Sequence, residues 1–140
     1  MPESPPPPSD YRLRVLVVED DADTATTFTF LLRQAGHTVA LATDGLAAVS
    51  QAGSFAPDVV LLDLRLPGLN GHIVAERLRE MAWERRPLII AITGFAEEWQ
   101  RLRPTETGVD LCLRKPADPA TLLGLLGRWA AGLRNRPAGQ

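Results

Sequence analysis

Five short apolar runs recur along this chain, and stretches with helical periodicity lie between them. The runs are rich in Val, Leu and Ile, and the continuous ones are typical of strands that are buried on both faces of a sheet. The five expected strands span residues 15–18, 38–42, 58–62, 88–92 and 109–114. Parallel strands need long crossover connections, which are right-handed. The pattern therefore predicts an α/β fold, with a doubly wound five-stranded parallel sheet that carries helices on both faces.

Apolar residues at helical spacing predict the helices of this fold. The expected helices span residues 22–35, 45–52, 71–81 and 119–133. Gly36 directly follows the first helix, as a C-terminal capping glycine does. Asp118 and Pro119 are favourable as the N-cap and the first residue of the last helix. Pro104 falls where a fourth helix should run. Because an interior proline costs about 3 kcal/mol, that helix is predicted to be short, displaced or late in starting.

Polar residues stand at the carboxyl ends of four of the expected strands. Glu19 and Asp20 follow the first strand, Asp63 the third, Thr93 the fourth and Lys115 the fifth. In a doubly wound sheet, ligands bind outside the carboxyl ends of the strands. We therefore expect these side chains to meet in one pocket, although they span almost the whole chain.

Three carboxylates in one pocket repel one another, by roughly 4 kcal/mol for each pair at about 4 Å and an effective dielectric near 20. A hard divalent cation offsets this repulsion. Mg²⁺ fits best, because it accepts a few carboxylates and keeps water ligands for phosphate oxygens. Phosphoryl transfer requires a nucleophilic carboxylate, a metal and donors that hold the phosphoryl oxygens. Asp63 is the expected nucleophile, and Lys115 adds one positive charge.

Four segments of the chain resemble the signature segments of response-regulator receiver domains. They are VLVVED at 15–20, DVVLLDLRLPGLNG at 58–71, AITG at 91–94 and LRKP at 113–116. The resemblance extends over residues 13–133 and implies the flavodoxin-like fold of that family. It also implies a signalling phosphoacceptor of a two-component system, not an enzyme with a separate substrate. A histidine kinase or a phosphohistidine carrier would phosphorylate Asp63.

The resemblance also implies which residues form the site. The expected Mg²⁺ ligands, direct or through water, are the carboxylates of Glu19, Asp20 and Asp63 and the backbone carbonyl of Arg65. Thr93 would bond one phosphoryl oxygen as the switch hydroxyl, and Lys115 would pair with another. A cis peptide to Pro116 is expected after Lys115, since an X–Pro bond prefers trans by only about 0.5 to 1 kcal/mol.

Cys112 departs from the family pattern, because receivers commonly place Tyr or Phe at this switch position. Its side chain is too small to fill the space that the switch hydroxyl leaves when it moves. We therefore expect the signal to be read out by backbone movement in residues 94–107. The resemblance leaves room for a homodimer through the fourth helix, the fifth strand and the fifth helix, and it does not identify the downstream protein target.

Simpler explanations exist for some of these residues. Acidic residues often cap helices, and this is the expected role of Asp21 or Asp23, whereas Asp20 is expected in the site. Asp63 precedes the turn-forming pair at 67–68 and would suit a turn. However, a carboxylate at the end of an apolar central strand needs a partner, which favours a functional role.

Two other functions are alternatives to the phosphoacceptor. A phosphatase of the haloacid dehalogenase type also places a nucleophilic Asp after a strand, but it has a second Asp two residues later, where this chain has Arg65. A receiver that acts as a phosphorylation-independent interaction module usually lacks the nucleophile or the lysine, and both are present. The sequence does not decide how the switch is used. The receiver could be a stand-alone regulator, a phosphoryl shuttle or a part of a larger hybrid kinase.

Composition limits the partners and the cellular location that can be expected for this chain. The formal net charge of -2 argues against a nucleic-acid surface built on bulk charge. No apolar run approaches the roughly 20 residues that cross a bilayer, and Cys112 has no internal disulfide partner, so a cytoplasmic location is expected. The expected organisation is a disordered Pro-rich leader at 1–11, a receiver at 12–133 and a tail at 134–140. The four leader prolines are expected to be stiff and extended, and a proline-binding partner is an alternative to a merely solvated leader.

Overall fold

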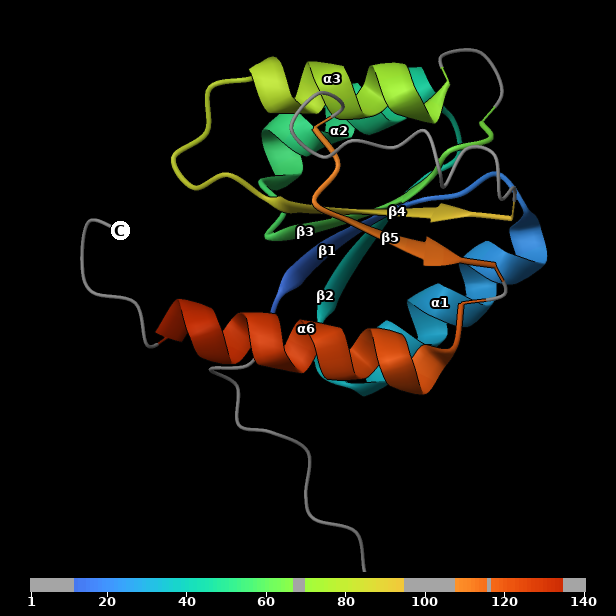
Figure 1. The fold of residues 1–140 in the computed structure, drawn as a ribbon, viewed down its shortest axis with the longest axis vertical. Helices are drawn as coiled ribbons and strands as arrows, with labels where there is room; N and C mark the ends of the chain where they lie inside the picture. Colours follow the sequence, from blue (N-terminus) through green and yellow to red (C-terminus); the bar gives the residue numbers. More distant parts are fainter. Residues whose placement is uncertain (1–11, 67–69, 95–107, 116, 135–140) are drawn as a thin grey trace, which may run out of the picture.

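The computed structural model describes residues 12–66, 70–94, 108–115 and 117–134. They form the predicted five-stranded parallel sheet, with strand order β2-β1-β3-β4-β5 (Figure 1). The strands are β1 (Arg14–Val18), β2 (Thr38–Ala42), β3 (Val59–Asp63), β4 (Leu88–Thr93) and β5 (Leu111–Arg114). All four strand pairings are parallel, so the carboxyl ends of the strands meet at one edge, which lies toward the right in Figure 1.

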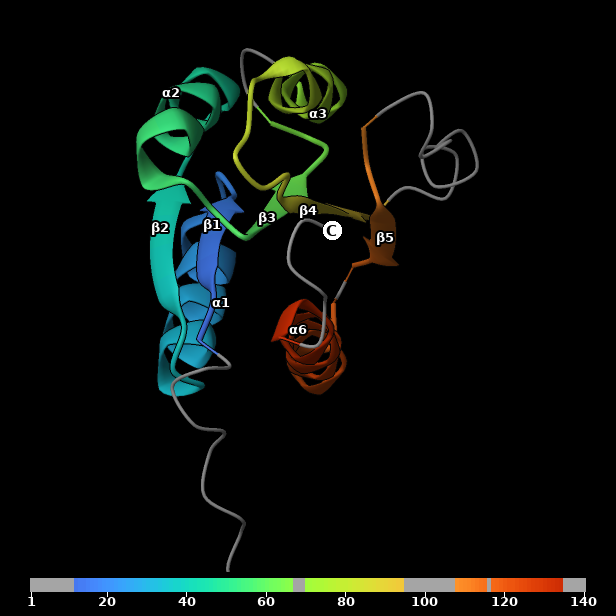
Figure 2. The ribbon, with the colours of Figure 1, turned by 90° about the vertical axis from the view of Figure 1, so that its left-hand side faces the viewer.

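Four helices cover both faces of the sheet, as predicted. They are α1 (Ala22–Gln34), α2 (Gly45–Phe55), α3 (Gly71–Glu80) and α6 (Pro119–Arg134). α1 and α6 pack on one face and α2 and α3 on the other (Figures 1 and 2). The inner strands are therefore buried from both sides: every residue of β3 and β4 is buried, and so is all of β1 except its first residue. The edge strands β2 and β5 are partly exposed, against the expectation of burial on both faces. No helix in the described ranges has the length and apolar character needed to span a membrane.

Each of these helices begins at an Asp or Asn whose side chain accepts a hydrogen bond from the backbone N–H three residues later. The capping residues are Asp21, Asp44, Asn70 and Asp118. Such a cap stabilises a helix by about 1 kcal/mol, because it pairs an amide that has no partner within the helix. The predicted capping roles of Asp21 and Asp118 are confirmed.

α2 is one turn longer than the sequence predicts. The sequence predicts an end at residue 52, whereas the helix continues to Phe55, and its C-cap Ala56 has the left-handed conformation, at φ 53°. Arg14 supports this end: its Nε donates to the Phe55 carbonyl at 2.9 Å, and its guanidinium lies 4.2 Å from the ring centroid of Phe55. A contact from the start of β1 therefore satisfies a carbonyl that the helix leaves unpaired.

Several predictions fall on residues outside the described ranges. These are the effect of Pro104 on the fourth helix, the cis peptide at Pro116, the leader and most of the tail. Cys112 is described: it lies half-buried in β5, opposite Ala91 of β4, and packs against the core on the α2 and α3 face.

We predict that Gly71→Ala destabilises the protein. A Cβ at Gly71 would lie 2.5 Å from the Leu64 Cα and 2.8 Å from the Asp63 carbonyl oxygen, so the backbone after β3 would have to move. Overpacking of this kind costs about 1 to 3 kcal/mol in the free energy of unfolding, measured by urea denaturation. Gly124→Ala is the control, because nothing lies within 4 Å of its Cβ. It should add up to about 1 kcal/mol through helix propensity. Equal effects of the two variants would contradict the close approach at Gly71.

Candidate functional site

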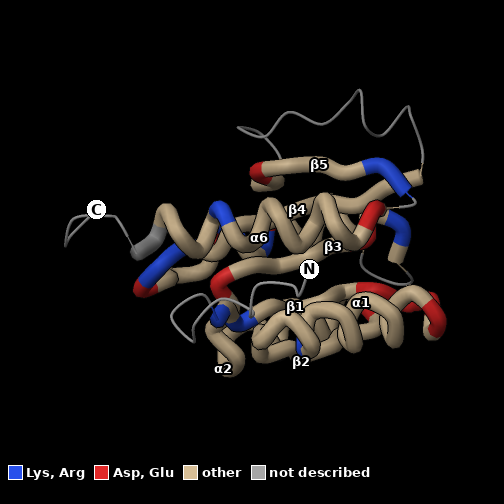
Figure 3. The backbone as a smooth tube through the Cα atoms, turned by 90° about the horizontal axis from the view of Figure 1, so that it is seen from below, with Lys and Arg blue, Asp and Glu red and all other residues tan. Residues whose placement is uncertain are grey.

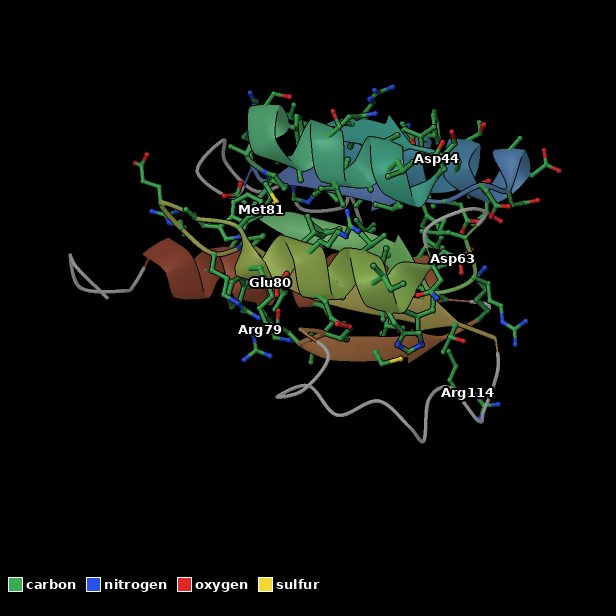
Figure 4. All side chains as sticks on the ribbon, turned by 90° about the horizontal axis from the view of Figure 1, so that it is seen from above. Asp44, Asp63, Arg79, Glu80, Met81 and Arg114 are labelled. Atoms are coloured by element: carbon green, nitrogen blue, oxygen red, sulfur yellow. The ribbon has the colours of Figure 1, made fainter. Side chains whose placement is uncertain are left out.

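The predicted site residues stand at the carboxyl edge of the sheet because each follows an apolar strand directly. Glu19 comes after β1, and its N–H donates to the carbonyl of Ala42 at 3.0 Å, so β2 helps to place it. Asp63 is the last residue of β3. Lys115 follows β5, and its N–H donates to the Thr93 carbonyl at 2.8 Å. In Figure 4, Asp63 and Arg114 lie toward this end of the molecule, and Arg79, Glu80 and Met81 lie toward the other end.

Three carboxylates gather at this edge, as the sequence predicts. One carboxylate oxygen from each of Glu19, Asp20 and Asp63 lies within 4.8 Å of the others. Glu19 and Asp63 are each only 3% exposed, whereas Asp20 is exposed to solvent. Figure 3 shows that further acidic residues gather at the start of α1, beside this cluster. A donor set made of carboxylate oxygens is typical of a site for a hard divalent cation.

Asp63 is held through both of its carboxylate oxygens. Its Oδ1 accepts a hydrogen bond from the backbone N–H of Arg65 at 2.9 Å. Its Oδ2 accepts one from the Lys115 Nζ at 3.1 Å. These two bonds orient the carboxylate at the end of a fully buried strand. A buried carboxylate with a charged partner and a metal-type donor set is typical of a functional position.

Lys115 links the two buried carboxylates. Its Nζ lies 3.1 Å from Asp63 Oδ2 and 3.7 Å from Glu19 Oε1. Burial would lower the pKa of Lys115, but the hydrogen bond with Asp63 and the charges of Asp63, Glu19 and Asp20 together raise that pKa above its ordinary value. The ammonium therefore stays charged and neutralises part of the negative charge of the cluster. Among the 140 residues it is the only lysine, and all other basic side chains apart from histidine are arginines.

The Glu19 carboxylate is destabilised in its charged form, and its pKa is raised. Burial, followed by the charge of Asp63, raises the pKa of Glu19 to about 7, against the lowering effect of a backbone hydrogen bond. That bond runs from the N–H of Asp21 to Glu19 Oε2 at 3.1 Å. Two buried carboxylates this close are costly when both are charged, and a bound cation would relieve that cost.

Thr93 and Arg65 lie where the sequence predicts them, next to Asp63. Thr93 ends β4, is 1% exposed and stands one residue beyond Ile92, the register partner of Asp63. Arg65 is exposed and contributes its backbone N–H to Asp63. The bond of its carbonyl to a metal and the bond of the Thr93 hydroxyl to a phosphoryl group stay predictions.

Two contacts of the site were missed by the sequence analysis. They are the backbone donors of Arg65 to Asp63 and of Asp21 to Glu19. A backbone N–H carries no residue-type signal, so no motif reports it. The carboxylate of Asp21 itself is the N-cap of α1. Hydrogen bonds from the side chain and backbone of Thr24 lower the pKa of Asp21.

Comparisons with known proteins agree with this geometry. The family model of the response regulator receiver domain matches residues 15–126. The phosphate regulon transcriptional regulatory protein PhoB of Klebsiella pneumoniae is 37% identical over 110 residues, which are 79% of this chain and 48% of the relative. The DNA-binding response regulator MtrA of Mycobacterium tuberculosis is 37% identical over 112 residues, which are 80% of this chain and 48% of the relative. The chain thus spans about half the length of the curated relatives it matches.

Solved structures show the same fold. The receiver domain of the sensor histidine kinase PA1611 from Pseudomonas aeruginosa superposes with a TM-score of 0.76 at 34% identity, covering 85% of this chain and 98% of that chain. That structure holds a magnesium ion coordinated in its active site cleft. The chemotaxis response regulator CheY4 of Vibrio cholerae has a TM-score of 0.75 at 27% identity, covering 82% of this chain and 96% of that chain.

Proposed function

We infer the function of this chain from the fact that it belongs to the response regulator receiver domain family, whose model matches residues 15–126. The chain is a receiver domain of the two-component type, a signalling phosphoacceptor. We propose that Asp63 is the phosphorylated residue and that a histidine kinase or a phosphohistidine carrier supplies the phosphoryl group. The observation that carries this proposal is the buried Asp63 carboxylate, bonded to Lys115 and within 4.8 Å of two further carboxylates.

We propose that the acidic cluster holds Mg²⁺, the ion present in the receiver of PA1611. The residues fit it, because three carboxylates supply hard oxygen ligands and their mutual repulsion is otherwise only partly offset by Lys115. Glu19, Asp20, Asp63 and the Arg65 carbonyl would hold the ion, directly or through water. Bound Mg²⁺ would neutralise charge on the phosphoryl oxygens.

The chain's own residues would perform the transfer. An oxygen of Asp63 attacks phosphorus, a P–O bond forms, and the P–N bond to the donor histidine breaks, with the electron pair returning to the imidazole. Lys115, which bonds Asp63 Oδ2 at 3.1 Å, would shift its hydrogen bond to a phosphoryl oxygen. Thr93 would donate its hydroxyl to another oxygen. The receiver would thus catalyse only its own phosphorylation and dephosphorylation.

We propose that the switch acts through protein contacts in the cytoplasm. The net charge of -2 gives no support to direct nucleic-acid binding, although the curated relatives are named as DNA-binding or transcriptional regulators. A homodimer through the fourth helix, the fifth strand and the fifth helix is part of this proposal. So is the division into a leader at 1–11, a receiver at 12–133 and a tail at 134–140.

A first test is Glu19→Gln, which removes a charge while it keeps an oxygen acceptor for the Asp21 N–H. Because Glu19 is buried against Asp63, we expect the metal-free protein to gain about 1 to 3 kcal/mol in the free energy of unfolding. We expect Mg²⁺ affinity, measured by calorimetric titration, to fall by about tenfold to a hundredfold. Glu76→Gln on the exposed face of α3 is the control and should change neither quantity. A Glu19→Gln protein that binds Mg²⁺ as well as the wild type would refute the assigned metal site.

A further inference from the structure

An open groove lies at the edge of the molecule opposite to β2, between β5 and α6. It has a volume of about 400 Å³ and is lined by Leu88, Asp110, Leu111, Leu125, Arg128 and Trp129. β5 and α6 run beside each other at this edge (Figures 1 and 2). Leu111 is 40% exposed there. The lining is mainly aliphatic and aromatic, with one charged group at each side.

The charged groups of the groove are not equivalent. Asp110 is already paired: its Oδ1 lies 3.1 Å from Arg86 Nη2, and its Oδ2 accepts from the N–H of Ile89 at 2.8 Å. Arg128 is exposed and forms no ion pair with any residue in the described part of the chain. The groove therefore presents an apolar floor with one available cation, and it suits an apolar segment that carries an acidic residue.

The amino-acid sequence contains a segment of this composition. Residues 5–8 are four consecutive prolines, and Glu3 precedes them. Proline runs adopt the polyproline II conformation before they bind, so they lose little entropy, and proteins recognise them with grooves that contain aromatic side chains. Trp129, with Leu111 and Leu125 beside it, provides such a surface.

The chain length allows this segment to reach the groove. Leu13 and Leu88 belong to the same buried cluster, and Leu88 also lines the groove. Val15, Val59 and Leu88 are register partners in one row across three strands, so Val15 and Leu88 lie about 10 Å apart. A polyproline segment advances about 3.1 Å per residue, so Pro8 is about 15 Å and Pro5 about 25 Å of chain from Leu13. In Figure 1 the starts of β1 and β5 and the end of α6 all lie toward the left.

We propose that residues Pro5–Pro8 dock in the groove between β5 and α6 of their own chain, with Glu3 beside Arg128. The docked segment covers Leu111 on β5, an edge strand of the sheet. Edge strands are sites of unwanted association when their apolar residues are open to solvent. The leader thus protects this edge, and it would have to leave before another protein could bind there.

The test places a nitroxide label at the leader of the full chain. Ser4→Cys is combined with Cys112→Ser, so that the label has one attachment site. We expect the label to broaden the amide signals of Leu111, Leu125 and Trp129 selectively, relative to the reduced label. Broadening that is absent, evenly spread or centred on another surface would overturn the proposal. Replacing Pro5, Pro6, Pro7 and Pro8 by serine should abolish the selective broadening, because serine does not favour the polyproline II conformation.

Exchanging the charges of Arg128 and Glu3 tests the direction in which the leader lies in the groove. Arg128→Glu should weaken docking by about twofold to fivefold, the range of a surface ion pair, and Glu3→Arg in the same molecule should restore it. Arg77→Glu, on the exposed surface of α3, is the matched control and should have no effect. Failure of Glu3→Arg to restore docking would refute the assigned pairing of Glu3 with Arg128.

Mixing experiments distinguish the other occupants of the groove. Labelled chains are added to isotope-labelled chains that carry no nitroxide. Broadening between the two would show that a second copy supplies the leader and would overturn docking within one chain. Groove signals that respond to removal of residues 135–140 but not to the proline replacements would assign the groove to the C-terminal tail instead.

Discussion

Asp63→Asn should take up no phosphoryl label from acetyl phosphate in the presence of Mg²⁺, whereas the wild type becomes labelled. The amide that replaces the carboxylate is not a nucleophile, so the loss should be complete and not partial. The fold should persist, because Asn still offers Oδ1 to the N–H of Arg65. Labelling is measured with radioactive donor or by intact mass, and circular dichroism reports the fold.

The control for this variant is Asp44→Asn, at the same end of the molecule (Figure 4). Asp44 caps α2, and Asn caps a helix as well as Asp does, so labelling should be unchanged. Chelation of Mg²⁺ should abolish labelling of the wild type, because the phosphoryl oxygens would then meet three carboxylates without a metal. Full labelling of Asp63→Asn, or of the wild type in chelator, would show that the phosphorylated site lies elsewhere.

Lys115→Ala should separate metal binding from phosphoryl transfer. Lys115 bonds Asp63 Oδ2 and is not a metal ligand, so its removal takes a positive charge away from the carboxylates that hold Mg²⁺. We expect Mg²⁺ affinity to stay the same or rise. The rate of labelling should fall by about tenfold to a hundredfold, the equivalent of one hydrogen bond to a charged group.

Lys115→Arg sharpens this test. The guanidinium keeps the charge but is a planar fork on a different stem, so it does not reproduce a compact ammonium 3.1 Å from Asp63 Oδ2. We expect normal Mg²⁺ binding and a labelling rate between those of Lys115→Ala and the wild type. A collapse of Mg²⁺ affinity in Lys115→Ala would contradict the division of roles between the lysine and the carboxylates.

The fold was predictable because its signals are local. Each buried strand is a continuous aliphatic run, and each described helix begins at an Asp or Asn that bonds the N–H three residues later. Parallel connectivity then places the carboxyl ends of the strands at one edge. The convergence of Glu19, Asp63 and Lys115 follows from that geometry, although 52 residues separate Asp63 from the lysine that it bonds.

Only the tertiary structure decided which of two neighbouring residues is buried and which is exposed. Glu19 and Asp20 are adjacent acids in the sequence, yet Glu19 is buried with a pKa of about 7 and Asp20 is exposed. The reason is that burial and local field depend on what packs beside a side chain, which one segment does not specify. The end of α2 at Phe55 depends likewise on Arg14 from another element. The groove between β5 and α6 exists because residues from three elements meet there, and no run of sequence contains it.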